Sequence, residues 1–112
     1  MQNRTHSARF TALSVWLMVC GSVSAAETYT LTIKEHRFEP VELEVPAGQK
    51  IKLIVKNEDP TPEEFESRSL KREKIIPGKS QATVSVGPLD PGTYEFFGEF
   101  HEESAKGRIV AK

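Results

Sequence analysis

The residues of this sequence best suited to chemistry are acidic side chains and one histidine in its C-terminal part. Glu99 and His101 lie two residues apart, and Glu64 and Glu66 have the same spacing. Residues two apart point to the same side of an extended strand, so each pair can present two ligands together. Imidazole and carboxylate ligands suit iron or Cu(II) better than Cu(I), which prefers sulfur. Convergence of the two pairs at one end of the fold would make a metal site.

The sequence lacks the residue patterns of other catalytic chemistries. It has no Cys-His pair, no Ser-His-Asp arrangement, no CxxC and no phosphate-binding loop. Its single cysteine, Cys20, lies in an N-terminal segment that we expect to be removed. We therefore expect a binding protein rather than an enzyme, with ferroxidase activity as the one catalytic option left open.

The first 26 residues are typical of a secretory signal peptide. A positively charged start precedes the apolar run 11–20, which is too short to span a bilayer comfortably. Small residues then offer a cleavage site after Ala25 or Ala26. The sequence thus predicts a signal peptide at 1–26, export, and no direct membrane insertion after cleavage, with an uncleaved anchor as the alternative.

Composition sets the class of the remaining chain, residues 27–112. Removing 1–26 takes away Arg4 and Arg9 and no acidic residue, so the formal charge moves from −1 to −3. A mildly acidic chain without a basic block is not expected to bind nucleic acid. Its length is enough for one small domain.

Hydrophobic alternation indicates strands rather than helices. Four stretches alternate between apolar and polar residues, and turn-forming Pro, Gly, Asn and Asp residues separate them; the stretches are 29–33, 38–45, 51–55 and 82–86. One-sided strands about ten residues apart favour an all-β antiparallel sandwich or Greek key.

Three segments resemble small periplasmic cupredoxins. They are the run that begins Phe38-Glu-Pro and ends at Ile51, the Asn57-x-Asp59 strand end, and Gly92–His101 followed by Gly107–Val110. The resemblance implies a cupredoxin-like Greek-key β-sandwich. It also implies that Gly98 stands where the copper-binding cysteine is expected, and Glu63 or Glu64 where the first histidine is expected. A blue-copper centre needs that thiolate, so the resemblance implies the fold without its usual chemistry.

Within the cupredoxins, the sequence is similar to the variant associated with bacterial periplasmic iron uptake, in EfeO-type proteins and FtrB-type components. The matching motifs are Glu64–Ser67, Glu73–Gly78, Gly87-Pro-Leu and Phe96–His101. This similarity implies location in the periplasm and a role in handling ferrous iron before import. It also implies as partners a P19-type periplasmic metal-binding protein, an inner-membrane iron permease and a membrane iron–sulfur protein.

The residues and the resemblance together give five candidate metal ligands. These are His101, Glu99, Glu64, Glu66 and Glu73, and the expected ion is iron or copper. For Glu73 the alternative is surface pairing with its basic neighbours in 71–74, a run that we interpret as a solvated edge strand.

Other polar and aromatic residues near these ligands receive structural interpretations. We interpret His36 as a surface or turn residue, and Glu63, Glu102 and Glu103 as solvent-exposed carboxylates, although Glu102 or Glu103 could reach an ion at His101. The phenylalanines at 96, 97 and 100 are expected to belong mostly to the core.

Three functional hypotheses follow. The first is a metal-binding module of a ferrous iron uptake system. The second is a ferroxidase or electron-transfer partner that uses bound copper. The third is a sandwich that has lost its metal and serves in protein interaction, since the fold alone permits all three.

Overall fold

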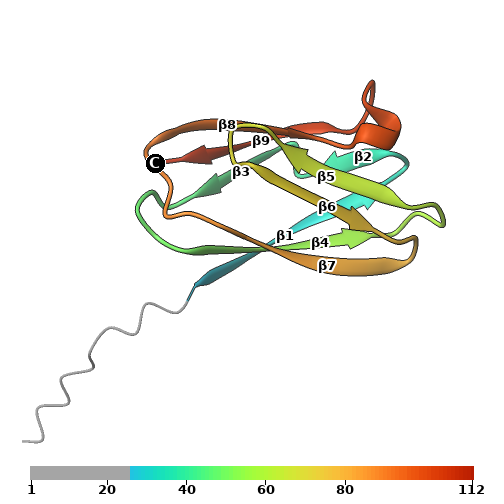
Figure 1. The fold of residues 1–112 in the computed structure, drawn as a ribbon, viewed down its shortest axis with the longest axis horizontal. Coiled ribbons are helices and arrows are strands. Elements are labelled where there is room, and N and C mark those ends of the chain that lie inside the picture. Colours follow the sequence, from blue (N-terminus) through green and yellow to red (C-terminus); the bar gives the residue numbers. More distant parts are fainter. Residues whose placement is uncertain (1–25) are drawn as a thin grey trace, which may run out of the picture.

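The computed structural model describes residues 26–112 as a two-layer β-sandwich (Figure 1). Residues 1–25, which hold nearly all of the predicted signal peptide, lie outside the described residues. The elements are β1 (Glu27–Lys34), β2 (Arg37–Glu39), β3 (Glu42–Val45), β4 (Ile51–Asn57), β5 (Glu63–Ser67), β6 (Arg72–Ile76), β7 (Ser80–Val86), β8 (Gly92–Phe97), the 3₁₀ turn η1 (Glu99–His101) and β9 (Lys106–Ala111).

The two sheets confirm the predicted all-β sandwich. One has the strand order β2-β1-β4-β7 and the other β3-β9-β8-β5-β6. The pairs β1–β4 and β3–β9 are parallel, so the sheets are mixed rather than purely antiparallel. Parallel neighbours need a crossover connection, and β2 and β3 lie in the connection between β1 and β4.

The stretch predicted as one strand at 38–45 forms two strands in different sheets. β2 ends at Glu39 and β3 begins at Glu42, with Pro40 between them. Proline lacks the N–H that a continuous ladder would need. The break leaves Phe38 buried in the core and Val41 58% exposed.

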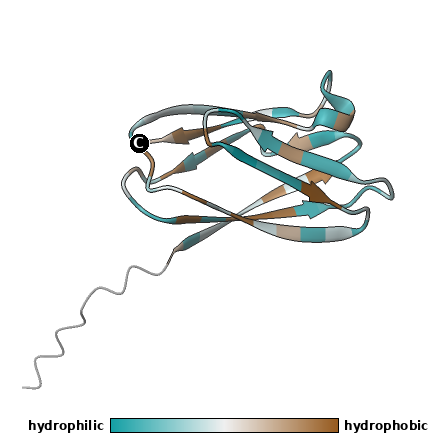
Figure 2. Ribbon diagram, viewed as in Figure 1, coloured by the Kyte–Doolittle hydropathy of each residue, from teal (hydrophilic) through white to brown (hydrophobic). Residues whose placement is uncertain are grey.

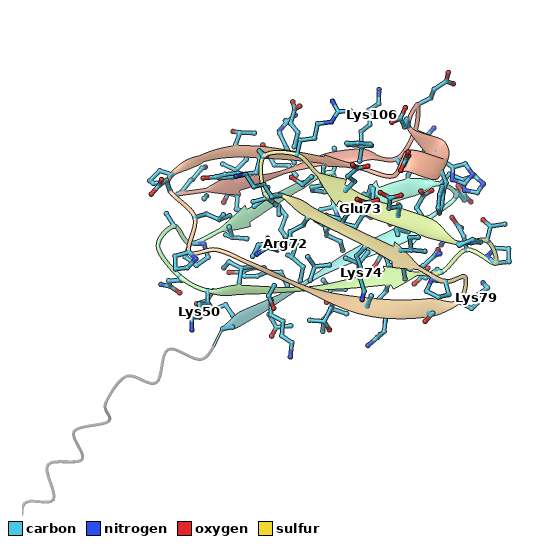
Figure 3. The ribbon with its side chains drawn as sticks, viewed as in Figure 1. Lys50, Arg72, Glu73, Lys74, Lys79 and Lys106 are labelled. Carbon is cyan, nitrogen blue, oxygen red and sulfur yellow. The ribbon has the colours of Figure 1, made fainter. Side chains whose placement is uncertain are left out.

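Strands β5 and β6 are not predicted by the alternation of apolar and polar residues. β5 is mostly hydrophilic in sequence, as Figure 2 shows, yet four of its five residues are buried. β6 lies at the edge of its sheet, and its Arg72, Glu73 and Lys74 are exposed (Figure 3). The solvated edge strand predicted around 71–74 is therefore confirmed.

An aromatic cluster joins the strands that position the candidate site. The Phe96 ring of β8 contacts Phe38 of β2 edge-on at 4.9 Å and Phe65 of β5 at 5.2 Å between ring centroids. All three rings are buried. Such pairs add about 0.5–1.5 kcal/mol each beyond their burial, so this cluster fixes the relative positions of β2, β5 and β8.

Helical structure in residues 26–112 is confined to the short turn η1. No helix of this part of the chain has the length and apolar character needed to cross a membrane.

Candidate metal centre

The connection between β4 and β5 is organised by Asn57 and Asp59. The buried Asn57 side chain donates to the carbonyl oxygens of Thr61 (2.8 Å) and Ile76 (3.2 Å). Its Oδ1 accepts from the backbone N–H of Asp59 at 3.0 Å. Because these bonds tie the end of β4 to the loop before β5 and to the end of β6, they set where β5 begins.

Asp59 in turn holds the tight turn that carries His36. Its carboxylate accepts from the backbone N–H groups of Glu35 (2.8 Å) and His36 (3.0 Å). These two residues have φ angles of 52° and 59°. Residues other than glycine seldom adopt this left-handed backbone conformation. Burial would raise the pKa of Asp59, but these N–H donors and the nearby His36 and Lys79 lower it overall. An ionised Asp59 thus fixes His36.

The turn η1 places His101 and separates it from Glu99. The backbone N–H of His101 bonds to Gly98 O at 3.1 Å, and Gly98 N–H bonds to Ala105 O at 2.9 Å. A 3₁₀ turn rotates by about 120° per residue, so residues two apart do not point the same way. The extended conformation that would have paired Glu99 with His101 ends at Phe97.

His36, Glu63 and His101 form the first ligand cluster, with one ligand atom from each within 4.8 Å of the others. Glu63 is 1% exposed and accepts a hydrogen bond from Nδ1 of His101. Its other oxygen accepts from the backbone N–H groups of Glu64 (3.0 Å) and Phe100 (3.2 Å). The rings of His36 and His101 are stacked, with 3.5 Å between centroids and 15° between planes.

Gly98 explains how Glu63 fits between the sheets. A Cβ atom on residue 98 would come within 2.6 Å of Glu63 Oε1 and 2.9 Å of the Ala105 Cβ. The carboxylate therefore occupies the space that a side chain at position 98 would need. A type-1 copper centre, which requires a thiolate, does not fit these residues, whereas two imidazoles and one carboxylate fit a borderline or hard divalent ion.

Glu64, Glu66 and Glu99 form a second cluster, also with ligand atoms within 4.8 Å of one another. Glu64 is 2% exposed. Burial first, and then hydrogen bonding with Glu99 and Glu66 and their charges, raise the pKa of Glu64 to about 8. The side chain is thus held in its protonated form near neutral pH when no cation is present.

The five predicted ligands are divided by the structure. His101 lies in the first cluster and Glu64, Glu66 and Glu99 lie in the second, while Glu73 belongs to neither. Glu73 is exposed on β6, directly opposite Glu66 in the strand register. No ion pair found among residues 26–112 involves Glu73, so its predicted pairing with basic neighbours is not formed there.

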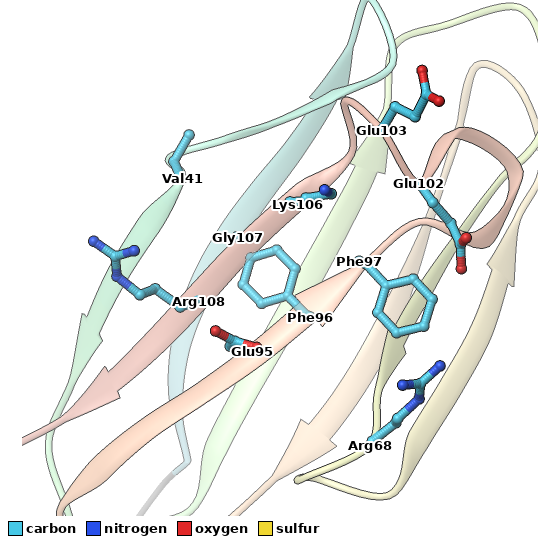
Figure 4. Close-up of a pocket in the computed structure, with 10 residues that line it drawn as sticks. All are labelled: Val41, Arg68, Glu95, Phe96, Phe97, Glu102, Glu103, Lys106, Gly107 and Arg108. Carbon is cyan, nitrogen blue, oxygen red and sulfur yellow. The ribbon is translucent and has the colours of Figure 1, made fainter.

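Glu102 and Glu103 lie in the loop after η1, exposed and outside both clusters. They border a shallow hollow of about 660 Å³ over β8 and β9 (Figure 4). Among the residues that line this hollow, the Arg68 guanidinium lies 5.4 Å from the centroid of the Phe97 ring. Of the three phenylalanines expected to lie mostly in the core, only Phe96 is buried there; Phe97 is half-buried and Phe100 is 46% exposed, so that prediction is wrong for the set.

Sequence reasoning missed two members of the first cluster. The solvated interpretation of Glu63 is wrong, because the side chain is buried against His101. The signal that could have found it is the expected ligand position after Asn57-x-Asp59. His36 does lie in a turn, as predicted, but its ring packs on His101, 65 positions later in the sequence. No local sequence pattern predicts a contact between residues so far apart.

Comparison with known proteins identifies the family and the fold. Residues 9–111 match the family described as cupredoxin-like domain. A protein of Rickettsia prowazekii (strain Madrid E), named uncharacterized protein RP394, is 49% identical over 80 residues, which are 71% of this chain and 64% of that protein. The chain thus matches less than two thirds of the length of that relative.

Solved structures share the fold at low sequence identity. Auracyanin A, a blue copper protein of Chloroflexus aurantiacus, has a TM-score of 0.68 and 17% identity over 79% of this chain and all of its own. The metal binding domain of the Streptococcus pneumoniae D39 Cu(I) exporting ATPase CopA has a TM-score of 0.64 and 13% identity, over 76% of this chain and 84% of its own. From its sequence match and its sandwich, this chain belongs to the cupredoxin-like domain family.

Proposed function

We propose that this protein binds a divalent transition-metal ion, iron in its physiological role, through His36, Glu63 and His101. The observation that carries the proposal is the convergence of two imidazoles and one buried carboxylate beside Gly98. Nitrogen and oxygen ligands of this kind suit Fe(II), Cu(II) and similar ions. A bound ion would take the place of the proton that His101 Nδ1 and Glu63 Oε2 share.

The surrounding contacts support a site that is formed in advance. Asp59 holds the turn of His36, and two backbone N–H groups orient the Glu63 carboxylate. Groups that orient the ligands in this way typically change metal affinity about 10- to 100-fold when they are removed. The proposed function needs no catalytic residue.

The proposal includes a cellular setting. The similarity to iron-uptake cupredoxins supports a location in the periplasm and partnership with a P19-type protein and an iron permease. Copper remains the competing ion, because Cu(II) binds nitrogen and oxygen sites more tightly than Fe(II) in general. Binding of copper in vitro would therefore agree with the site without identifying the ion used in the cell.

An anaerobic titration of the metal-free protein with Fe(II), and a parallel titration with Cu(II), tests the proposal. We expect one equivalent at this site and a loss of affinity of about tenfold or more in His101→Ala, His36→Ala and Glu63→Gln. Glu102→Gln, an exposed carboxylate of the adjoining loop, is the matched control and should bind as the unmodified protein does.

Two outcomes would decide against the proposal. Unchanged metal affinity in all three variants would contradict the assignment of the site to these residues. Absence of metal binding by the unmodified protein would favour an interaction domain. Consumption of more than one equivalent of Fe(II) per chain on admission of oxygen would instead indicate a ferroxidase.

A further inference from the structure

The carboxylates of Glu64, Glu66 and Glu99 gather on the side of β5 opposite to Glu63. Consecutive residues of a strand point to opposite faces of its sheet, so Glu63 and Glu64 serve different sites. Glu66 follows Glu64 on the same face, and Glu99 comes from η1, which packs against β5. One oxygen of each lies within 4.8 Å of the others.

One oxygen of Glu64 provides a second observation, independent of the clustering, that points to a ligand. Its side chain is 2% exposed, and its Oε1 atom is buried without a hydrogen-bond partner. It is the one buried side-chain oxygen or nitrogen of residues 26–112 in that condition. A buried polar atom of this kind carries a substantial desolvation cost, and native structures usually satisfy such atoms with a partner, water or ion.

Neighbouring side chains do not neutralise the cluster. No ion pair found in the described part of the chain involves Glu64, Glu66 or Glu99. The Arg68 guanidinium, two positions after Glu66 in the sequence, lies over the Phe97 ring. Three carboxylates close together without a basic partner favour a cation of two or three charges.

We propose that Glu64, Glu66 and Glu99 form a second, oxygen-only site for a hard cation such as Ca²⁺, Mn²⁺ or a trivalent ion. The ligand atoms set this class, because carboxylates without imidazole or sulfur suit hard ions. The inference goes beyond the proposed function and does not depend on it. It assigns to this face an ion different in chemistry from the one at His36, Glu63 and His101.

Binding of Tb³⁺ and of Mn²⁺ to the metal-free protein tests this site with two hard probes. Lanthanide luminescence reports Tb³⁺ occupancy and the loss of its bound water, and electron paramagnetic resonance reports free Mn²⁺. We expect one bound ion that has lost part of its water shell. Its affinity should fall about tenfold or more in Glu64→Gln and in Glu99→Gln.

Glu73→Gln is the matched control, since it removes one acidic charge from the same face, opposite Glu66, at a residue outside the cluster. Equal loss of Tb³⁺ in Glu73→Gln and Glu64→Gln would reduce the effect to general surface charge and overturn the proposal. Unchanged binding in both Glu64→Gln and Glu99→Gln would do the same. Because Glu99 is exposed, its variant carries the test if Glu64→Gln does not fold.

The two sites can be scored separately with the same samples. Glu64→Gln should keep its Cu(II) affinity at the first site, and His101→Ala should keep its Tb³⁺ affinity at the second. Loss of Cu(II) binding alone in His101→Ala, with Tb³⁺ retained, supports both assignments. If the unmodified protein binds Tb³⁺ but not Cu(II), the result would contradict the proposed function and leave the second site supported.

Discussion

Glu63 fills the space beside Gly98 that a side chain at position 98 would occupy. A Cβ atom there would lie 2.6 Å from Glu63 Oε1, far inside contact distance. The two residues, 35 positions apart, therefore depend on each other. The missing side chain at 98 leaves room for a buried carboxylate, and this carboxylate supplies the ligand oxygen of the first cluster.

This dependence predicts that Gly98→Ala destabilises the protein by about 1–3 kcal/mol through overpacking. The cost should shrink in a Glu63→Ser background, where the clashing carboxylate is gone. Urea unfolding of the single variants and the double variant measures the coupling, which we expect to be about 0.5–3 kcal/mol. Additive effects would mean that Gly98 and Glu63 do not compete for the same space.

Copper should give no intense blue colour with this protein. The described site holds no thiolate, and the strong absorption of blue-copper proteins depends on one. Gly98→Cys alone should also lack the intense blue absorption with Cu(II), because Glu63 obstructs the new side chain. Adding Glu63→His should remove the clashing carboxylate and supply an imidazole, and we expect intense blue absorption from the double variant. Blue colour in Gly98→Cys alone would contradict the packing.

Glu64 predicts an unusual dependence of stability on pH. Its pKa is raised from 4.5 to about 8 in the folded protein, so between these values the folded state holds a proton that the unfolded state has lost. Stability then falls as pH rises from about 4.5 to 8. Glu64→Gln should remove this fall and be more stable at alkaline pH, by on the order of 1–3 kcal/mol.

Chemical denaturation of the metal-free protein across this pH range checks the prediction. Glu64→Gln and the unmodified protein should be similar in stability near pH 4.5 and diverge above it. Glu73→Gln, at an exposed position of the facing strand, should follow the unmodified protein throughout. Parallel curves for Glu64→Gln and the unmodified protein would show that Glu64 does not retain its proton.

Asp59 should act on the first site through the turn of His36. Asp59→Ala removes the acceptor for the backbone N–H groups of Glu35 and His36. We expect a loss of about 1–3 kcal/mol in stability, because these donors lose their partner. The imidazole resonances of His101 should also shift in the NMR spectrum as the stacked His36 ring moves away. Glu58→Ala, at the exposed neighbouring position, should change neither quantity.

The alternation of apolar and polar residues predicted β1, β4 and β7 but did not predict β5, whose buried residues are mostly polar. β1, β4 and β7 place apolar side chains inward at every second position, and this alternation is local. β5 carries three glutamates among its five residues, and all three belong to the clusters. A hydrophilic strand can be buried when its carboxylates find partners on neighbouring elements, which no local pattern reveals.

The sequence by itself determined the fold class through local alternation of apolar and polar residues, and its resemblance to cupredoxins pointed to Gly98. It also named four of the six residues that form the two clusters, namely Glu64, Glu66, Glu99 and His101. Tertiary structure alone decided how the ligands are grouped. The turn held by Asp59 places the His36 ring against His101. The 3₁₀ turn η1 points Glu99 and His101 in different directions, so that they belong to different clusters. These outcomes rest on backbone dihedral angles and contacts between distant segments, which residue spacing does not encode.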